Sequence, residues 1–427
     1  MHSFRPRIQT KFFNILQLLK LQQRGKSKSK SEAEFERKLN EEVFIMSAVR
    51  TPIGSFGKSL SAFSAPQLGA VEAVEKSGFS NKQVQEVYMG NGFQGGVGQA
   101  PARQAAIFAG LPPDTVDCTT INKLEASGMK SIILGTLNLK CGDQQVMVAG
   151  GMESMSNIVF YLKRGYPTFG GMKLHDGIIH DCQTNAYNQV HIGSCAEKVA
   201  KTMKITREQQ DAYALCSYRK RAEANEKGVF KAEVVPVKIS QGKGKKDTEF
   251  SVDEERKTID PQILPKLPTL FKSDHGTITS GNASSINDGA AAVVLATESA
   301  VNTVKTKPLA RIVGFQDAAT DPMDFCRASV HAIQKILERN NIKKEDIALW
   351  EIDEGFGLIA IVNKILLEID PKKVNVHGGS VSLGHPIGMT GTRMVVHLCH
   401  ALNPGDYGMA AICNGGGGAS AILIQRI

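Results

Sequence analysis

The chain has 427 residues, 42% of them hydrophobic, which is enough apolar content for two or three buried cores and argues against a disordered protein. Its formal net charge is +9, but the excess lies in residues 1–31, where basic residues occur without a single acid. Because the rest of the chain is nearly neutral, the charge gives no support to a nucleic-acid-binding surface, and no nucleic-acid partner is expected.

Residues 1–40 have the composition of a mitochondrial presequence, because Phe, Leu and Ile side chains alternate with Arg and Lys in a segment poor in acids. The apolar run is too short and too interrupted to cross a bilayer, so no membrane span is expected. A disordered basic tail or a surface helix is the alternative interpretation. The presequence predicts a location in the mitochondrial matrix.

The cysteines show no CxxC pair and no short cysteine–histidine spacing of the kind that binds a metal. They occupy positions 118, 141, 182, 195, 216, 326, 399 and 413. This spacing indicates reduced thiols rather than a disulfide framework, and most should be small buried apolar residues. No redox cofactor is expected.

Short β-rich runs alternate with helical patterns, beginning with "EEVFIMSAVR" at residues 41–50 and ending with "GMAAICNGGG" at 408–417. Apolar positions recur every three or four residues in 329–341 and 391–403, which predicts helices that cover a sheet. Three histidines of these helices are read as packing or surface residues: His331, His397 and His400. The alternation predicts an α/β fold.

The character of the chain changes between residues 158 and 280, where charged and proline-rich stretches predict an inserted loop domain. The rest of the chain divides into two portions with similar patterns of β-rich and helical runs. The first spans residues 41–157 and is completed by about 281–306, and the second spans 307–427. Each contains a glycine-rich stretch, "VAGGMES" or "CNGGGGAS", so a duplicated α/β core is predicted.

Three segments carry a chemical signal, and the first is "TTINKLEASGMK" at residues 119–130. Glu125 lies where turn residues meet the start of a predicted helix, at the positive end of the helix dipole. A reactive side chain at this place would be activated as an anion. The alternative is an ordinary first-turn carboxylate.

The other two segments are rich in small residues. His385 lies between glycine and proline in "GGSVSLGHPIGMTG", where neither a helix nor a central strand would readily place it. Cys413 ends an apolar strand and precedes Gly415 in a glycine run whose N–H groups could approach a ligand closely. Taken singly, His385 could be structural and Cys413 could mark only a tight hairpin.

Five ordered motifs together resemble the thiolase family, over nearly all of the chain from residue 42 onwards. They are "TTINKxxASGMK", "VMVAGGMESMSN", "NASxxNDGAAA", "GGxVSLGHPIGMTG" and "ICNGGGGAS". The resemblance implies a five-layered αβαβα fold of two similar halves with a loop domain over the substrate. It also implies the reversible Claisen condensation of two acetyl-CoA molecules to acetoacetyl-CoA and free coenzyme A, usually by tetramers.

By this resemblance a nucleophilic cysteine should stand at position 125, where the chain has Glu125. His385 matches the histidine that activates the nucleophile, and Cys413 matches the cysteine that moves a proton at the α-carbon. A carboxylate is a weak nucleophile toward a thioester, so ordinary turnover should fail or slow greatly. The sequence leaves open whether Glu125 acts as a base or mimics an acylated cysteine.

A second departure is Asp353, which replaces the asparagine that helps to stabilise enolate charge in the family. As an anion Asp353 would repel that charge, whereas a protonated Asp353 could still donate a hydrogen bond.

The nucleotide-binding stretch departs as well, with Thr258 and Ile263 where the family has Arg and Lys, although Arg256 or Lys257 could partly substitute. The residues that the resemblance assigns to coenzyme A are His191, Tyr218, Asp260, Ser284 and Gly415. Those that match a potassium-binding pattern are Tyr218, Ser280, Gly281, Ala283 and Val381, of which Ser280 and Gly281 replace alanines.

Two classes of function remain open from the sequence. The first is a thiolase-type acyltransferase whose chemistry is impaired or altered at Glu125. The second is an inert homologue that binds acyl-CoA and serves as a partner subunit. The first predicts acyl-CoA as the substrate of a homotetramer, and the second predicts a mixed tetramer with an active paralogue.

Overall fold

The computed structural model describes residues 41–70, 72–165, 169–255 and 259–427. The predicted presequence, together with Arg256 and Lys257, lies outside the described residues. The described residues from Glu42 onwards form one compact unit.

One mixed sheet runs through this unit in the order β12-β13-β14-β11-β1-β10-β5-β3-β4, with the short β2 paired to β10. Neighbouring strands are antiparallel except for β3 with β4, β3 with β5 and β12 with β13, which are parallel. The strands are β1 Val43–Arg50, β2 Gly54–Ser55, β3 Glu86–Gly90, β4 Asp117–Ile121, β5 Val146–Ser154, β10 Asn287–Thr297, β11 Ala310–Ala319, β12 Ile347–Ile352, β13 Tyr407–Asn414 and β14 Gly418–Arg426. Only two residue pairs join β1 to β11, so this junction divides the sheet into two halves.

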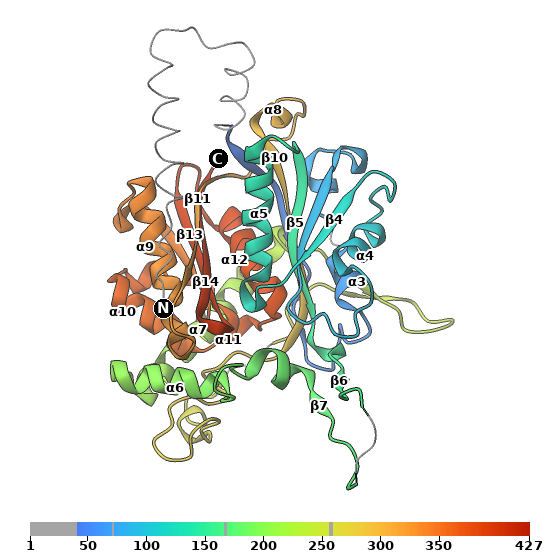
Figure 1. Cartoon of the computed structure of the whole chain (residues 1–427). Coiled ribbons are helices and arrows are strands. Elements are labelled where there is room, and N and C mark those ends of the chain that lie inside the picture. Colours follow the sequence, from blue (N-terminus) through green and yellow to red (C-terminus); the bar gives the residue numbers. More distant parts are fainter. Residues whose placement is uncertain (1–40, 71, 166–168, 256–258) are drawn as a thin grey trace, which may run out of the picture. The chain divides into compact units, whose positions relative to one another are not determined.

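Two helices, α5 (Ser127–Cys141) and α12 (Ile387–Ala401), lie between the two halves of the sheet (Figure 1). Helix α12 contacts β5 and β10 in one half and β12 and β13 in the other. Every residue from Ile387 to Cys399 is buried, as a helix packed between two sheets requires. These two helices form the middle layer of the fold.

The outer faces of the two half-sheets are covered by helices from their own half of the chain (Figure 1). Helices α3 (Ala65–Gly69) and α4 (Pro101–Phe108) pack on one face. Helices α9 (Ala328–Asn340) and α10 (Gly357–Leu367) pack on the other. The layers therefore follow the order αβαβα, and the predicted fold class is confirmed.

The inserted segment contains more regular structure than the sequence predicts. Its helices are α6 (Ile192–Met203) and α7 (Arg207–Glu226), and its strands are the pairs β6 (Phe160–Tyr161) with β7 (His175–Asp176) and β8 (Val237–Ile239) with β9 (Thr248–Phe250). The short helices α8 (Glu298–Val301) and α11 (Ser380–Leu383) lie beyond it. Helix α7 has 20 residues, so the segment predicted as a loop domain contains a long helix besides its loops.

Glycines allow the middle helices to approach the sheet closely. A Cβ atom on Gly151 of β5 or on Gly128 of α5 would collide with the carbonyl oxygen of Gly388 in α12. Because all three positions lack a side chain, the N-terminal ends of α5 and α12 meet beside β5. These ends carry Glu125 and His385. Within the described ranges, no helix is long and apolar enough to cross a membrane.

A buried cluster of charges ties the inserted segment to the sheet and to α12. Arg50 Nε lies 2.7 Å from Glu233 Oε1, and His397 Nδ1 lies 2.9 Å from Glu233 Oε2. Burial opposes the charge of Glu233, but His397 and Arg50 outweigh burial and hold its pKa well below the usual range. Burial likewise lowers the pKa of His397, but the Glu233 carboxylate outweighs it and raises that pKa above its ordinary value.

The raised pKa of His397 predicts a pH-dependent stability. Since the folded chain holds this proton more tightly than the unfolded chain, the stabilisation is complete below about pH 6.5 and is lost as the pH rises through the folded pKa. Replacing His397 by glutamine should therefore lower the melting temperature more at about pH 6 than at about pH 9, by about 2 °C or more. His331→Gln, at an exposed position, is the control, and an equal effect of His397→Gln at both pH values would contradict the prediction.

Candidate active site

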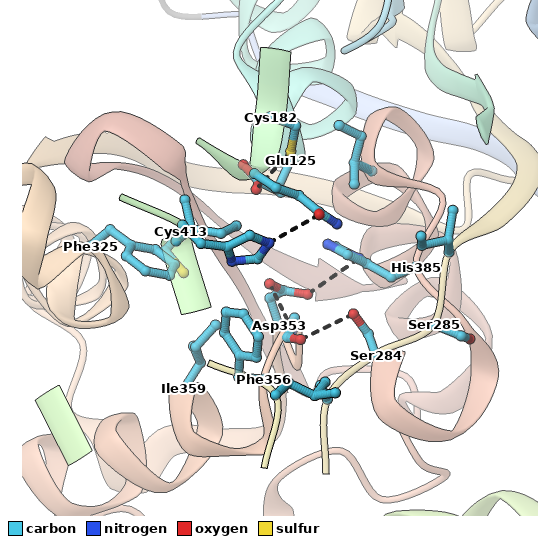
Figure 2. A pocket seen from close by; sticks show the side chains of 18 of the residues that line it. Glu125, Cys182, Ser284, Ser285, Phe325, Asp353, Phe356, Ile359, His385 and Cys413 are labelled. Carbon is cyan, nitrogen blue, oxygen red and sulfur yellow. Dashed lines mark hydrogen bonds and ion pairs between the residues drawn. The ribbon is translucent and has the colours of Figure 1, made fainter. Parts of the chain in front are cut away.

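A cavity of about 370 Å³ opens between the ends of the middle helices, strand β13 and the inserted segment. Its polar lining includes Glu125, Cys182, His191, Ser284, Asp353, His385 and Cys413, and its apolar lining includes Phe271, Phe325, Phe356 and Ile359. Figure 2 shows Glu125, Asp353, His385 and Cys413 around one space. A few polar groups in a largely apolar wall are typical of a small-molecule site.

Glu125 lies in the short helical turn η3 (Leu124–Ala126), directly before α5. Its side chain is 6% exposed, and its Oε2 accepts a hydrogen bond of 2.9 Å from the N–H of Gly415. The thiol of Cys182 donates to Oε1 across 3.6 Å. Burial raises the pKa of Glu125, although the N–H groups of Glu125 itself and of Gly415 oppose this rise.

His385 is fixed by its backbone and by one ring nitrogen. Its N–H donates to Asn287 Oδ1 at 2.9 Å, and its Nδ1 lies 2.9 Å from Thr390 Oγ1. The preceding Gly384 has a φ of 105°, a conformation that disfavours any residue with a side chain. The ring is thereby held with Nε2 on the side of Gly355, another residue of the cavity wall.

Asp353 follows strand β12 and lies beside His385 (Figure 2). Its Oδ1 is 3.8 Å from His385 Nδ1 and accepts a hydrogen bond of 3.1 Å from Ser380 Oγ. Its Oδ2 accepts from the N–H of Gly355 at 3.2 Å. The carboxylate is 2% exposed, so the cavity contains a second buried acid besides Glu125.

Cys413 stands near the end of β13, where Gly416 and Gly417 adopt positive φ angles and turn the chain into β14. Its side chain is buried and lines the same cavity as Asp353. Burial, followed by the charge of Asp353, raises the pKa of Cys413 well above its usual value. The structure therefore holds this residue as a thiol at neutral pH.

The residues predicted to bind coenzyme A differ in where they lie relative to the cavity. His191 and Ser284 line the cavity: His191 stacks on Phe271 with a centroid distance of 4.5 Å, and Ser284 Oγ donates to the carbonyl of Gly355 at 3.0 Å. Gly415 instead donates its N–H to Glu125. Asp260 is exposed on a loop, outside the residues that line the cavity.

The predicted potassium ligands are distributed over a small buried cluster and the cavity wall. Tyr218 and Val381 belong to one small buried cluster, and Ala283 lines the cavity. Gly281 is crowded by Leu264, so the alanine that the resemblance implies would not fit there without movement. Burial raises the pKa of Tyr218, and the nearby carboxylates of Glu255 and Glu354 add to this rise.

Cys182 is a residue of the cavity wall that the sequence did not single out. The thiol of Cys182 reaches Glu125 from the inserted segment, 57 residues away in the chain. Its local sequence carries no motif that would have revealed this contact.

The sequence also matches known family patterns over both halves of the described unit. The pattern described as "Thiolase, N-terminal domain" matches residues 43–299, and "Thiolase, C-terminal domain" matches residues 306–426. The chain belongs to the thiolase family. This thiolase therefore has the family relationship that its motifs predict.

Relatives of this thiolase cover nearly its full length. The mitochondrial acetyl-CoA acetyltransferases of mouse and human are each 54% identical over 389 residues, which are 90% of this chain and 91% of theirs. A thiolase from Ascaris suum, solved in complex with coenzyme A, is 44% identical with a TM-score of 0.87, and the match covers 90% of this chain and all of that one. The acetyl-CoA acetyltransferase of Bacillus anthracis is 36% identical with a TM-score of 0.86, over 91% of this chain and 99% of its own.

Proposed function

We propose that this thiolase acts on acetyl-CoA and acetoacetyl-CoA as an acetyl-CoA acetyltransferase whose covalent acyl-transfer step is altered at residue 125. The observation that carries this proposal is the hydrogen bond that Glu125, a residue of the cavity wall, accepts at Oε2 from the N–H of Gly415. A carboxylate held there occupies donors that could otherwise hold the oxygen of an acyl group on residue 125. The reaction class is the reversible condensation of two acetyl-CoA molecules to acetoacetyl-CoA and coenzyme A.

Substrate binding follows from the lining of the cavity. The acyl end of the thioester lies among Glu125, His385 and Cys413, and the pantetheine arm passes Ser284 and the stacked pair of His191 and Phe271. The complex of the Ascaris suum relative with coenzyme A supports this ligand. Asp260 is exposed and lies apart from the cavity lining, so most of the binding energy should come from the arm rather than from the nucleotide.

The remaining groups suit proton transfer at the α-carbon. His385 Nε2 can exchange a proton with the bound thioester while Thr390 Oγ1 keeps the opposite ring nitrogen oriented. In the cleavage direction Cys413, held as a thiol, gives its proton to the carbon that becomes the methyl group of acetyl-CoA. In the condensation direction the same sulfur takes that proton back.

Calorimetric titration of the full chain with acetyl-CoA tests the binding part of the proposal. We expect a dissociation constant between about 1 µM and 1 mM, the span of ordinary Michaelis constants. Ser284→Phe should fill the cavity and weaken binding by about 10-fold or more. The matched control is Ser240→Phe at an exposed position, which should leave the affinity unchanged, and equal affinities of the wild type and Ser284→Phe would contradict the assigned site.

A partner-subunit role is the second candidate, because large apolar side chains are exposed around β6 and β7. They are Phe160, Leu162, Phe169, Met172 and Leu174. An exposed apolar group of this kind favours assembly with other subunits. A mixed tetramer predicts co-purification with a cysteine-bearing paralogue, whereas exclusive self-assembly into a homotetramer would contradict it.

Location and ion binding complete the proposal. Relatives such as the mouse and human enzymes are mitochondrial proteins by name, which supports the mitochondrial matrix as the location of this chain. A potassium ion would be held by the Tyr218 hydroxyl and by backbone oxygens near Val381 and Ala283. When bound, such an ion supplies positive charge that stabilises the segments around Tyr218, Ala283 and Val381.

A further inference from the structure

An uncommon backbone conformation, a π-helical turn, places Cys182 next to Glu125. Cys182 lies in the π-helical turn Ile179–Gln183 of the inserted segment, and such turns are frequent at functional sites. Its thiol faces Glu125 Oε1 at 3.6 Å, as the dashed line in Figure 2 shows. Both residues line the same cavity as His385 and Cys413.

We propose that Cys182 is the acyl-accepting nucleophile of this thiolase and that Glu125 is its general base. The inference rests on the proposed function, because it concerns the acyl-CoA bound in that cavity. Both residues then have a catalytic role. The thiol that other thiolases carry at position 125 is supplied here by a cysteine of the inserted segment.

The two carboxylate oxygens of Glu125 have different partners, and this arrangement suits a general base. Oε2 is held by the N–H of Gly415, which fixes the carboxylate and leaves Oε1 directed at the thiol of Cys182. The apolar neighbours of Cys182 hold its side chain in place and keep water away from an acylated sulfur. They are Phe93, Met155, Ile178 and Ile387.

The electrostatics require that proton removal accompany the attack. Burial, followed by the charge of Glu125, raises the pKa of Cys182 well above its usual value, so the resting residue is a thiol. Burial also raises the pKa of Glu125, which makes it a stronger base than an exposed carboxylate. A proton can therefore pass between these groups during the reaction without a stable thiolate.

The step is a thioester exchange. The Cys182 sulfur forms a bond to the carbonyl carbon of acetyl-CoA while its proton moves to Glu125 Oε1. The bond from that carbon to the sulfur of coenzyme A then breaks, and the proton on Glu125 passes to the departing thiolate. The products are acetylated Cys182 and free coenzyme A, so no other reactant is needed.

The test is the position of the acetyl group after the full chain has reacted with acetyl-CoA. The reaction is stopped with acid, and the digested protein is mapped by mass spectrometry. We expect one acetyl group on the peptide that contains Cys182 and none after Cys182→Ser or Cys182→Ala. Cys141→Ser, which removes an exposed cysteine outside the cavity, should retain the label in full.

Glu125→Gln tests the base separately, because it keeps the shape of the side chain and removes its basicity. The rate of labelling on Cys182 should fall by about 100-fold, the usual contribution of a general base, while the affinity for acetyl-CoA changes little. A label on Glu125 or Cys413, or unchanged labelling in Cys182→Ala, would overturn the proposal. If acetyl-CoA binds but no residue is acetylated, only the assignment of Cys182 is overturned. If acetyl-CoA does not bind, the proposed function is overturned as well.

Discussion

Replacing Glu125 by cysteine is expected to raise the rate of acetoacetyl-CoA thiolysis by about 1000-fold or more, since removal of a nucleophile typically costs several powers of ten. The new thiol would stand at the start of α5, at the positive end of the helix dipole, with His385 in the same cavity. The N–H of Gly415, which now holds the carboxylate, would become available to an acyl oxygen. Steady-state kinetics of purified wild type and variant give the ratio.

Glu125→Ala is the control for this experiment, because it frees the same donors without supplying a thiol. It should show no comparable rise. A Glu125→Cys variant as slow as the wild type would mean that the remaining site is not competent, and Asp353 or the weakened nucleotide contacts would then be responsible.

The second large effect is expected from Asp353→Asn in the Glu125→Cys background. Asp353 is buried 3.8 Å from the ring of His385, where its charge opposes an enolate and its oxygens can only accept while it is ionised. An asparagine of the same size supplies N–H donors, and one such donor is worth about 100-fold in turnover in other enzymes. We therefore expect the turnover number of the double variant to exceed that of Glu125→Cys by about 100-fold.

The matched control replaces an exposed carboxylate of similar local geometry. Asp370 accepts a backbone N–H at the start of a short helical turn, and asparagine caps such a turn equally well. Asp370→Asn in the same background should leave turnover unchanged. Equal or lower turnover after Asp353→Asn would show that the carboxylate orients His385 rather than opposing the enolate.

The sequence predicted the α/β core well because its elements have strong local patterns. The run at 41–50 contains β1, and the pattern at 391–403 belongs to α12, which begins earlier, at Ile387. The start of α12 was missed because glycine and proline around His385 do not show helical periodicity. Helix α7 was missed for a related reason: its sequence is rich in charged residues, and packing together with the capping box at Thr206 and Gln209 makes it helical.

The residues of the site were predictable where each stood in a short motif. Glu125, Asp353, His385 and Cys413 come from four separate segments, and the structure brings them to one cavity. Cys182 could not be predicted, because its role depends on where the inserted segment folds over Glu125. Asp260 was assigned to coenzyme A by resemblance, but in the structure it lies apart from the cavity lining.

The most direct test of the central claim, that Glu125 in place of the family's cysteine makes acyl transfer slow, is the absolute rate of acetoacetyl-CoA thiolysis by the wild-type full chain. Mass spectrometry of the same preparation must exclude contamination by a cysteine-bearing paralogue. We predict turnover about 1000-fold below the roughly 10 per second that is ordinary for enzymes. Turnover on the order of 1–1000 per second would contradict the account.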